Sequence, residues 1–510
     1  MRNSVTADVS VCARTLRRVS GTSNDDNDQS SLTPRERRSL TRVRSDGAMI
    51  ATLAATGLIA AFMQTLVTPI IPTLPQLLNT TSADASWVLT ATLLSAAIST
   101  PISGRLGDMY GKRRIMLLLL AIMVGGTVIS ALSNTLIPMV VGRVLQGIGL
   151  GVIALGISIL RDVIHPKNLG GAVALVSATL GIGGALGLPL AATIAQFLDW
   201  HFLFWLATLL GIGAIIAVAT IIPVSTLRSG GRFDLLGAVG LAVGLVGILL
   251  AVSKGTEWGW TSPLTLSLLI GGIVVLLVWG FVELRTTDPL IDLRVASRRP
   301  VLLTNFTSIT IGFAFFIVTA ALPIVLEAPA ASGIGLGQPL IIASLCLMPL
   351  GVVMFIMSPV AARLTAARGP RVSLIVGGMI VAIGFAIAVF LLDEVWHIIL
   401  VSSITGLGVG FAYAAMPTLI MQSVPPTETA AANGLNSVMR TLGSTISATL
   451  VALILASNTQ AFGDATLPTR GAFAIVFTMG AAVVLAGVVI ALFIPRKTTR
   501  YDTASIPTQR

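Results

Sequence analysis

A cluster of charge between two apolar stretches is the part of this chain best suited to do chemistry. The stretch "GRLGDMYGKRR", residues 104–114, holds five charged side chains, although only 10% of the chain is charged. Gly104 and Gly111 allow a tight turn, and cations prefer the cytoplasmic side of a membrane. Asp108 could pair with a neighbouring Arg, or lie against a helix N-terminus, whose free N–H groups attract anions. The pattern predicts a short charged loop that either orders itself or contacts another helix.

Two arginines fall inside apolar stretches. Arg440 is about ten residues into its stretch, roughly 15 Å deep, where an Arg costs about 2.5 to 3.5 kcal/mol. It should therefore face a cavity or a partner, or pin two helices together. Arg143 lies nearer the outer end of its stretch and could also snorkel outward.

Acidic groups are missing from the same depth. No Asp or Glu lies deep in an apolar stretch, and the three histidines fall at the ends of such stretches, which excludes an intramembrane histidine relay. Glu327 comes nearest. If the protein moves protons, we expect Glu327 or Asp108 to change protonation; otherwise Glu327 is a solvated rim residue. No Cys/His spacing predicts a metal, and no phosphate-binding loop predicts a cofactor.

The elements that position these residues are apolar runs. The chain is 55% hydrophobic, and a spanning helix needs roughly 20 apolar residues. Fourteen such runs follow residue 47, at 48–72, 86–103, 115–133, 136–160, 170–197, 203–223, 236–252, 263–282, 301–326, 339–361, 372–392, 398–421, 430–456 and 471–494. We predict an all-α membrane protein with a disordered tail at 1–47, a second tail at 495–510 and no soluble domain.

The distribution of positive charge gives the orientation. An even number of spans puts both termini on one side, and placing that side in the cytoplasm puts 28 of the 32 Lys and Arg inside. Only Lys254 and Arg470 then lie outside, a strong positive-inside signal. The net charge of +11 reflects this topology and contact with membrane lipids, not nucleic acid. We predict a plasma membrane (bacterial inner membrane) protein with both termini cytoplasmic.

An internal repeat divides the chain. The segment "ARLTAARGPRV" at 362–372 echoes the charged stretch, with Gly369 and Arg371 answering Gly111 and Arg113. Both segments follow an outside-to-inside run, as expected of a duplication. The predicted organisation is a first six-helix bundle at 48–223, an inserted helix pair and linker at 224–300, and a second bundle at 301–494.

Several motifs together resemble the major facilitator superfamily, and within it the fourteen-span drug:proton antiporters. The charged stretch matches that superfamily's loop motif through Gly104, Arg105, Leu106, Asp108, Gly111, Lys112 and Arg113. "RVLQGIG", with Arg143 and Gln146, is similar to its fourth-span motif. "GGRFDLLG" at 230–237, "DPLIDLR" at 288–294 and "NSVMRTLGSTI" at 436–446 resemble segments of the fourteen-span branch.

The resemblance implies a fold and a function. The fold is two six-helix bundles with inverted repeats plus an inserted helix pair. The function is secondary active transport by alternating access, with proton-coupled efflux of amphipathic drugs or toxic compounds and no enzyme activity. It implies a gate formed by Gly104, Arg105, Asp108, Gly111 and Arg113. In that gate Asp108 contacts a helix N-terminus across the bundle interface, with Thr427 or Thr429 as the N-cap. The alternative is that Asp108 only orders its loop.

The sequence also departs from the family pattern. Gly183, Gly187 and Pro189 keep the helix-bending character of the fifth span without its full motif, so ordinary close packing is the alternative. Relatives often carry an acid in the first span, where this chain has Met63 and Gln64. Candidates for a proton or charge relay are Arg143, Gln146, Glu327 and Arg440. Candidates for the substrate cavity are Gln64, Thr68, Trp87, Asn305 and Phe306.

The expected partners are an amphipathic small molecule, protons and membrane lipids. Two buried arginines without a buried acid favour neutral or anionic amphipaths. An exporter of an endogenous lipid or metabolite is the alternative within transport. A membrane-embedded protein without transport activity is the alternative outside it, and an enzyme would need a polar catalytic cluster that the short loops do not offer.

Overall fold

A computed structural model describes residues 46–71, 73–224, 228–462 and 465–495. Nearly all of the two predicted tails, 1–47 and 495–510, lies outside the described residues. The chain from Met49 onward forms one compact unit. In the described part, thirteen helices are long and apolar enough to cross a membrane, and one bent helix pair raises the number to fourteen. The prediction of fourteen spanning helices is confirmed.

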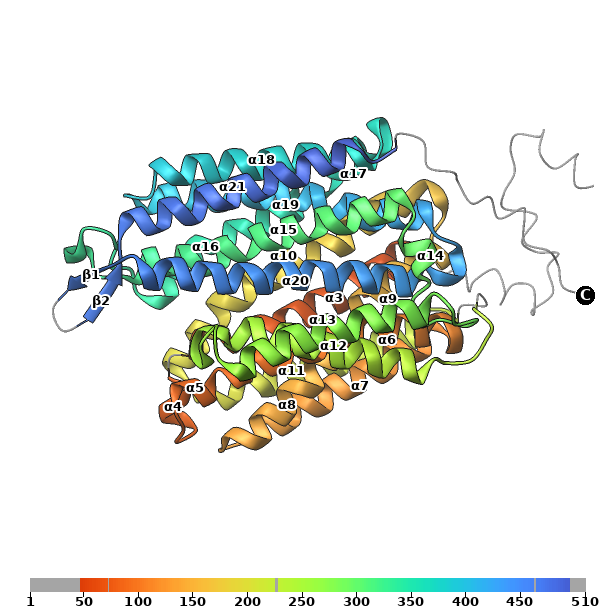
Figure 1. Ribbon diagram of the computed structural model, residues 1–510, viewed down its shortest axis with the longest axis horizontal. Helices are drawn as coiled ribbons and strands as arrows, with labels where there is room; N and C mark the ends of the chain where they lie inside the picture. The colour runs from red at the N-terminus through yellow and green to blue at the C-terminus, as the bar shows by residue number, and fades with distance from the viewer. Residues whose placement is uncertain (1–45, 72, 225–227, 463–464, 496–510) are drawn as a thin grey trace, which may run out of the picture. The chain divides into compact units, whose positions relative to one another are not determined.

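The helices form two six-helix bundles with an inserted pair between them in sequence (Figure 1). The first bundle comprises α3 (Asp46–Thr65), α6 (Trp87–Tyr110), α7 (Lys112–Ala131), α8 (Leu136–Gly149) with α9 (Val152–Val163), α10 (Pro166–Phe197) and α11 (His201–Ile221). The inserted pair is α12 (Leu235–Trp258) and α13 (Pro263–Glu283). The second bundle comprises α15 (Arg299–Glu327), α16 (Leu340–Ile356) with α17 (Ser358–Arg368), α18 (Pro370–Phe390), α19 (Val395–Ser423), α20 (Thr429–Ser457) and α21 (Arg470–Leu492). Short elements lie between them: η2 (Thr68–Ile70), α4 (Leu74–Leu77), α5 (Ser82–Ala85), α14 (Leu293–Ala296), η3 (Ala330–Ser332) and η4 (Pro426–Glu428).

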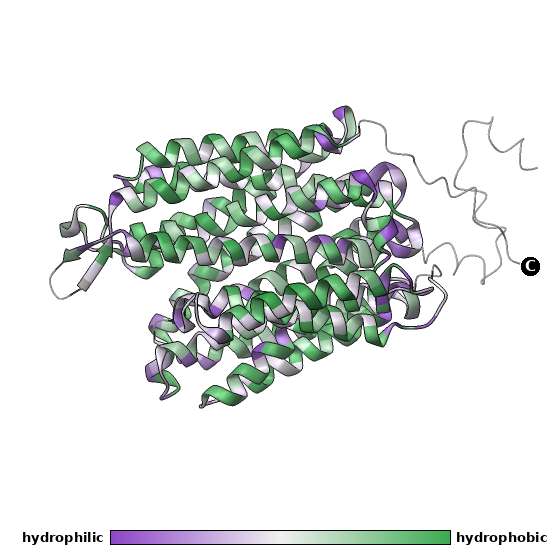
Figure 2. Ribbon diagram, viewed as in Figure 1, coloured by the Kyte–Doolittle hydropathy of each residue, from purple (hydrophilic) through white to green (hydrophobic). Residues whose placement is uncertain are grey.

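Each bundle has its own apolar core. One cluster of buried side chains draws almost entirely on residues 49–222 and another on residues 311–494. Hydrophobic residues run along the helices, while hydrophilic residues collect at the helix ends (Figure 2). Below, the end of the helices that carries Gly111 is called the Gly111 end, and the end that carries Trp87 is called the Trp87 end.

The inserted helix α12 packs against both bundles. A third cluster joins Leu241, Leu245 and Leu249 of α12 to Ala97 of α6 and Val438 of α20. By contrast, only 11% of the residues in the apolar part of α13 are buried. The inserted pair therefore contributes one helix to the bundle interface and exposes most of the other.

One small sheet departs from the all-α prediction. Strands β1 (Thr459–Phe462) and β2 (Ala465–Pro468) form an antiparallel hairpin in which Thr459 faces Pro468. The hairpin lies between α20 and α21 at the Trp87 end (Figure 1). Its strands are too short to give a sequence signal, because period-2 alternation needs more than four residues to be distinguished.

The predicted charged loop at 104–114 is mostly helix. Helix α6 continues to Tyr110 and α7 begins at Lys112, so Gly111 alone forms the junction. Its φ of 104° is a conformation that favours glycine. Gly104 lies inside α6 rather than in a turn, and the loop prediction was wrong because charged residues at a helix end resemble a loop in composition.

The repeat seen in the sequence has a structural counterpart. Gly369, with φ 86°, separates α17 from α18 as Gly111 separates α6 from α7. The Arg113 side chain donates a hydrogen bond to Ala219 O near the end of α11. Correspondingly, Arg371 donates to Leu492 O at the end of α21. In each bundle the same position ties the last helix to the third.

Candidate functional site

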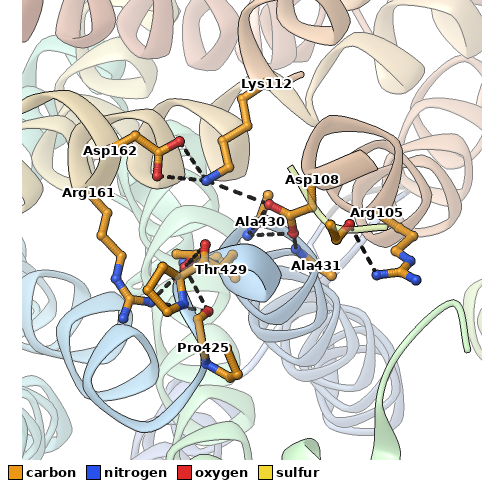
Figure 3. Close-up of polar contacts among 12 residues, drawn as sticks. Arg105, Asp108, Lys112, Arg161, Asp162, Pro425, Thr429, Ala430 and Ala431 are labelled. Atoms are coloured by element: carbon orange, nitrogen blue, oxygen red, sulfur yellow. Dashed lines mark hydrogen bonds and ion pairs between the residues drawn. The ribbon is translucent and has the colours of Figure 1, made fainter. Parts of the chain in front are cut away.

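Asp108 belongs to α6 of the first bundle, and its side chain contacts the N-terminus of α20 in the second bundle. Its Oδ2 accepts hydrogen bonds from the Ala430 and Ala431 amides at 3.1 and 3.0 Å (Figure 3). The residue is 1% exposed. The first amides of a helix have no partner within the helix and carry the positive end of its dipole. A buried carboxylate at this point therefore joins the two bundles electrostatically.

Three further charged residues surround Asp108. Lys112 Nζ lies 2.8 Å from Asp162 Oδ2 and 3.7 Å from Asp108 Oδ1. Arg161 reaches from α9 to the second bundle, where it donates to Val424 O at 3.1 Å and to Thr429 Oγ1 at 2.6 Å (Figure 3). We call Asp108, Lys112, Arg161 and Asp162, with the start of α20, the latch cluster. Its contacts between bundles are hydrogen bonds to the start of α20 and to the segment before it.

Sequence analysis missed Arg161 and Asp162. The available signal was an adjacent pair of opposite charges at the end of the fourth apolar run, in "ILRDVIHP". The expected threonine N-cap was wrong as well: the N-cap position is Glu428, without a side-chain capping bond, and Thr429 is the first helical residue. The Thr429 hydroxyl instead receives Arg161, while Asp108 takes the free amides.

Close backbone approach makes this contact possible. A Cβ atom placed on Gly104 would lie 2.6 Å from Ala430 O and 3.0 Å from Ala431 Cα. A second glycine, Gly434, faces the backbone of Thr100 and Pro101 in the same way. Helices α6 and α20 can pack this closely because small residues occupy both surfaces.

Arg105 belongs to a cavity beside the latch cluster. The cavity has a volume of about 320 Å³ and is lined by Arg105, Ser229, Ile291 and Glu428 among others. Arg105 Nη1 lies 3.4 Å from Ser229 Oγ, and the Ser229 amide donates to Asp108 O at 2.7 Å. The segment before α12 thus folds back on the end of α6.

Arg143 forms a second polar network inside the first bundle. It is fully buried, which rules out the outward snorkelling that the sequence allowed. Its guanidinium donates to Met63 O at 3.1 Å, to Val88 O at 3.3 Å and to Gln146 Oε1 at 2.6 Å. Gln146 in turn donates to Ser130 Oγ at 3.2 Å. The network joins α3, α6, α7 and α8, and backbone carbonyls of α3 and α6 accept hydrogen bonds from the Arg.

Arg440 is half-buried in the second bundle. Its guanidinium carbon lies 4.9 Å from the centre of the Tyr413 ring, and Nη2 donates to Ser437 Oγ at 3.2 Å. Among the described residues no carboxylate forms an ion pair with it. Nearby on the same helix, Asn436 donates to Asn305 Oδ1 at 3.0 Å and to Ser308 Oγ at 2.6 Å. Helices α15 and α20 are therefore joined by amides, while the Arg keeps donors available.

The chain matches the description Major Facilitator Superfamily over residues 53–448. It belongs to that superfamily. A lincomycin resistance protein of Listeria monocytogenes is 27% identical over 417 residues, covering 79% of this chain and 86% of the relative. Multidrug resistance protein 3 of Bacillus subtilis is 25% identical, covering 72% and 71%. An uncharacterised transporter of Mycobacterium tuberculosis is 29% identical over 271 residues, but the match spans only 39% of its length.

Solved structures agree on the fold of this major facilitator. The human organic anion transporter MFSD10 superposes with a TM-score of 0.60 at 13% identity, covering 88% of this chain and 99% of that chain. The proton:xylose symporter XylE gives 0.61 at 15% identity, covering 89% and 97%. At these identities the similarity establishes architecture alone. The chain is a multi-pass membrane protein of this superfamily.

The predicted cavity residues differ in their contacts and exposure. Trp87 lies beneath Lys254, with the ammonium 4.9 Å from the ring. Asn305 bonds Asn436, whereas Thr68 is exposed on η2 and Phe306 is 49% exposed on α15. Gln64 lies beside Arg143, whose Nη2 donates to the backbone carbonyl oxygen of Gln64 at 3.4 Å. The structure thus separates the five into different surroundings.

The remaining sequence candidates lie apart from the latch cluster. Gly183 and Gly187 face α3 so closely that a Cβ would lie 2.6 Å from Leu58 O and 2.4 Å from Thr65 Oγ1, respectively. Pro189 sits within the continuous helix α10. Glu327 is exposed at the last position of α15.

Lys254 lies within a helix and not in the connection where the sequence placed it. It was expected in an outer loop, but α12 continues to Trp258 and Lys254 is 2% exposed. Its ammonium donates to Ala83 O at 3.1 Å and Ser86 Oγ at 2.5 Å, and pairs with Glu257 at 2.7 Å. The Lys thus fastens α12 to the first bundle at the Trp87 end.

Proposed function

We propose that this transporter exports amphipathic small molecules by alternating access, in exchange for protons. The observation that carries the proposal is the latch cluster, in which a buried carboxylate and an arginine of one bundle bind the start of a helix in the other. Alternating access needs contacts strong enough to close one end and weak enough to break. A carboxylate at a helix N-terminus is worth about 0.3 to 2 kcal/mol, which fits both needs.

The proposed orientation puts the Gly111 end in the cytoplasm. The excess of Lys and Arg on this side supports it, and both termini are then cytoplasmic in a plasma (bacterial inner) membrane. The moving units are the bundles at 48–223 and 301–494, with 224–300 as the inserted part. Gly104, Arg105, Asp108, Gly111 and Arg113 are the proposed gating residues.

The proposed substrate is a neutral or anionic amphipath. Support comes from Arg440, which has no carboxylate partner among the described residues and stands beside an aromatic ring. An Arg held in this way can receive an anionic group without first breaking an ion pair. Export as the direction rests on relatives whose names refer to lincomycin and multidrug resistance.

The test is a transport assay in inverted membrane vesicles with paired fluorescent amphipaths of opposite charge. Substrate should accumulate when the vesicle interior is acidified, and accumulation should stop when the pH gradient is collapsed. Charge reversal by Arg440→Glu should reduce uptake of the anionic probe more than that of the cationic probe. Uptake that ignores the gradient would refute proton exchange, and equal losses for both probes would refute the role of Arg440.

A further inference from the structure

Two carboxyl groups meet where the inserted helices α12 and α13 approach each other at the Gly111 end. Asp234 is the N-cap of α12, and its Oδ1 accepts from the Gly237 amide at 2.7 Å. Glu283 is the last residue of α13 and is 2% exposed. Its Oε1 accepts from the Ile291 amide at 2.8 Å. One oxygen of each carboxyl is therefore satisfied by a backbone donor.

The other oxygen of each carboxyl lies beside Gly237. Both crowd the same point, because a Cβ atom on Gly237 would lie 2.3 Å from Asp234 Oδ2 and 2.8 Å from Glu283 Oε2. Both oxygens therefore lie beside the same backbone position of α12. Glu283 Oε2 is nonetheless buried without any protein donor. A hydrogen bond between two carboxyl oxygens exists only if one of them carries a proton.

No cation of the described chain neutralises this pair. The charged side chains on the adjoining segments 228–234 and 284–294 and near the end of α6 include Arg105, Arg228, Arg232, Arg285, Asp288, Asp292 and Arg294. The Asp288 carboxylate accepts from the Arg232 amide, and the Arg294 side chain donates to Leu284 O. None of these forms an ion pair with Asp234 or Glu283 among the described residues. Glu283 is buried and Asp234 is half-buried, and two carboxylates in contact repel each other, so such pairs retain a proton.

We propose that Asp234 and Glu283 form a proton-binding site that holds one proton between Asp234 Oδ2 and Glu283 Oε2. In the protonated state one carboxyl O–H donates to the other carboxylate, which satisfies both oxygens. Removal of the proton to water leaves two negative charges in contact. The site lies outside both bundles, and its assignment does not depend on which substrate is exported or on proton exchange being the driving reaction.

The site is connected to the latch cluster through its second hydrogen bond. Ile291, whose amide binds Glu283, lines the 320 Å³ cavity together with Arg105 and Glu428. Glu428 is the N-cap residue of α20, two residues before Ala430, whose amide donates to Asp108. Loss of the proton should loosen the linker around Ile291 and thereby the wall of this cavity.

The direct test is infrared difference spectroscopy of the purified full-length protein between neutral and alkaline pH. The wild type should show a protonated carboxyl C=O band that shifts in D₂O and disappears on alkalinisation. That band should be missing from Glu283→Gln and Asp234→Asn. Glu257→Gln, which changes the partly exposed carboxyl that pairs with Lys254 on α12, is the matched control and should keep it. A band that survives in both variants of the pair would overturn the assignment.

A second measurement covers the case in which a substitution disturbs folding. Glu283→Gln keeps an acceptor for Ile291 and supplies a donor for Asp234, so it imitates the protonated site. After correction for the intrinsic effect of pH, exchange of the Ile291 amide should accelerate at alkaline pH at least several-fold in the wild type but not in Glu283→Gln. Equal pH dependence in the two proteins would contradict a proton held by this pair.

Discussion

Replacing Asp108 by Asn removes the charge from the latch cluster while keeping the size of the side chain. The carboxylate accepts from two amides, those of Ala430 and Ala431. Asn offers a single acceptor oxygen, and its NH₂ group faces a donor. Hydrogen bonds to charged groups contribute about 1.5 to 3 kcal/mol, against roughly 0.5 to 1.5 for neutral ones. We therefore expect the closed Gly111 end to lose about 1 to 2 kcal/mol, a factor of roughly 5 to 30 in the open population.

Cysteine accessibility measures this population. Ala432 lines the cavity beside the latch cluster, so Ala432→Cys, in a chain whose two native cysteines are replaced, reports on opening. In inverted vesicles its alkylation by an impermeant maleimide should be roughly 5 to 30 times faster with Asp108→Asn. Transport should fall because closure of this end becomes limiting, while the amount of protein in the membrane stays the same.

The control is Asp393→Asn, which removes an exposed carboxylate that pairs with Arg470 at the Trp87 end. It should leave both alkylation and transport unchanged. If Asp108→Asn alkylates and transports like the wild type, the latch cluster does not set the equilibrium between open and closed states, and the carboxylate only orders the end of α6.

Three further substitutions test other contacts. Gly104→Val should push α6 away from Ala430 O, which a Cβ would approach to 2.6 Å. At a cost of about 1 to 3 kcal/mol it should accelerate alkylation as Asp108→Asn does, and an unchanged rate would refute close packing here. Arg143→Lys keeps the charge but loses the planar guanidinium. The free energy of unfolding in detergent should therefore fall by about 1 to 3 kcal/mol and the melting temperature with it; an equal melting temperature would contradict the network. Lys254→Met should leave Ala83 O without its donor and loosen the packing of α12 at the Trp87 end. Proteolysis should then be faster at that end and unchanged at the Gly111 end.

The fold could be predicted because it follows from properties that are local in sequence. Apolar run length and the distribution of Lys and Arg reveal spans without any knowledge of packing. Gly111 was identified for the same reason, since its backbone requirement lies in one residue. The charged stretch was misread as a loop because composition does not show where a helix ends; that depends on the backbone at Gly111 and on α20 packing against Gly104.

The candidate site could be predicted only in part, because its partners are remote in sequence. Asp108 could be recognised as a carboxylate that would contact a helix N-terminus, but the amides that bind it are 322 and 323 residues away. Arg161 had no motif to mark it, and its acceptors, a main-chain oxygen of Val424 and the hydroxyl of Thr429, are more than 260 residues away. Lys254 was placed beyond the end of its helix because hydropathy counts a charge as a boundary, whereas Ala83 and Ser86 supply acceptors that let a Lys be buried.

The repeat that relates the two bundles is incomplete at one position. In the alignment of 104–114 with 362–372, Ala366 answers Asp108, and the equivalent contact between α10 and α17 is made by small apolar side chains such as Ala174 and Ala361. At the interface of α6 and α20, water must therefore reach the buried charges before the bundles can separate. The interface of α10 and α17 can move without exposing a charge. We expect the Gly111 end to open by rotation of the bundles about the interface of α10 and α17, with water entering first between α6 and α20.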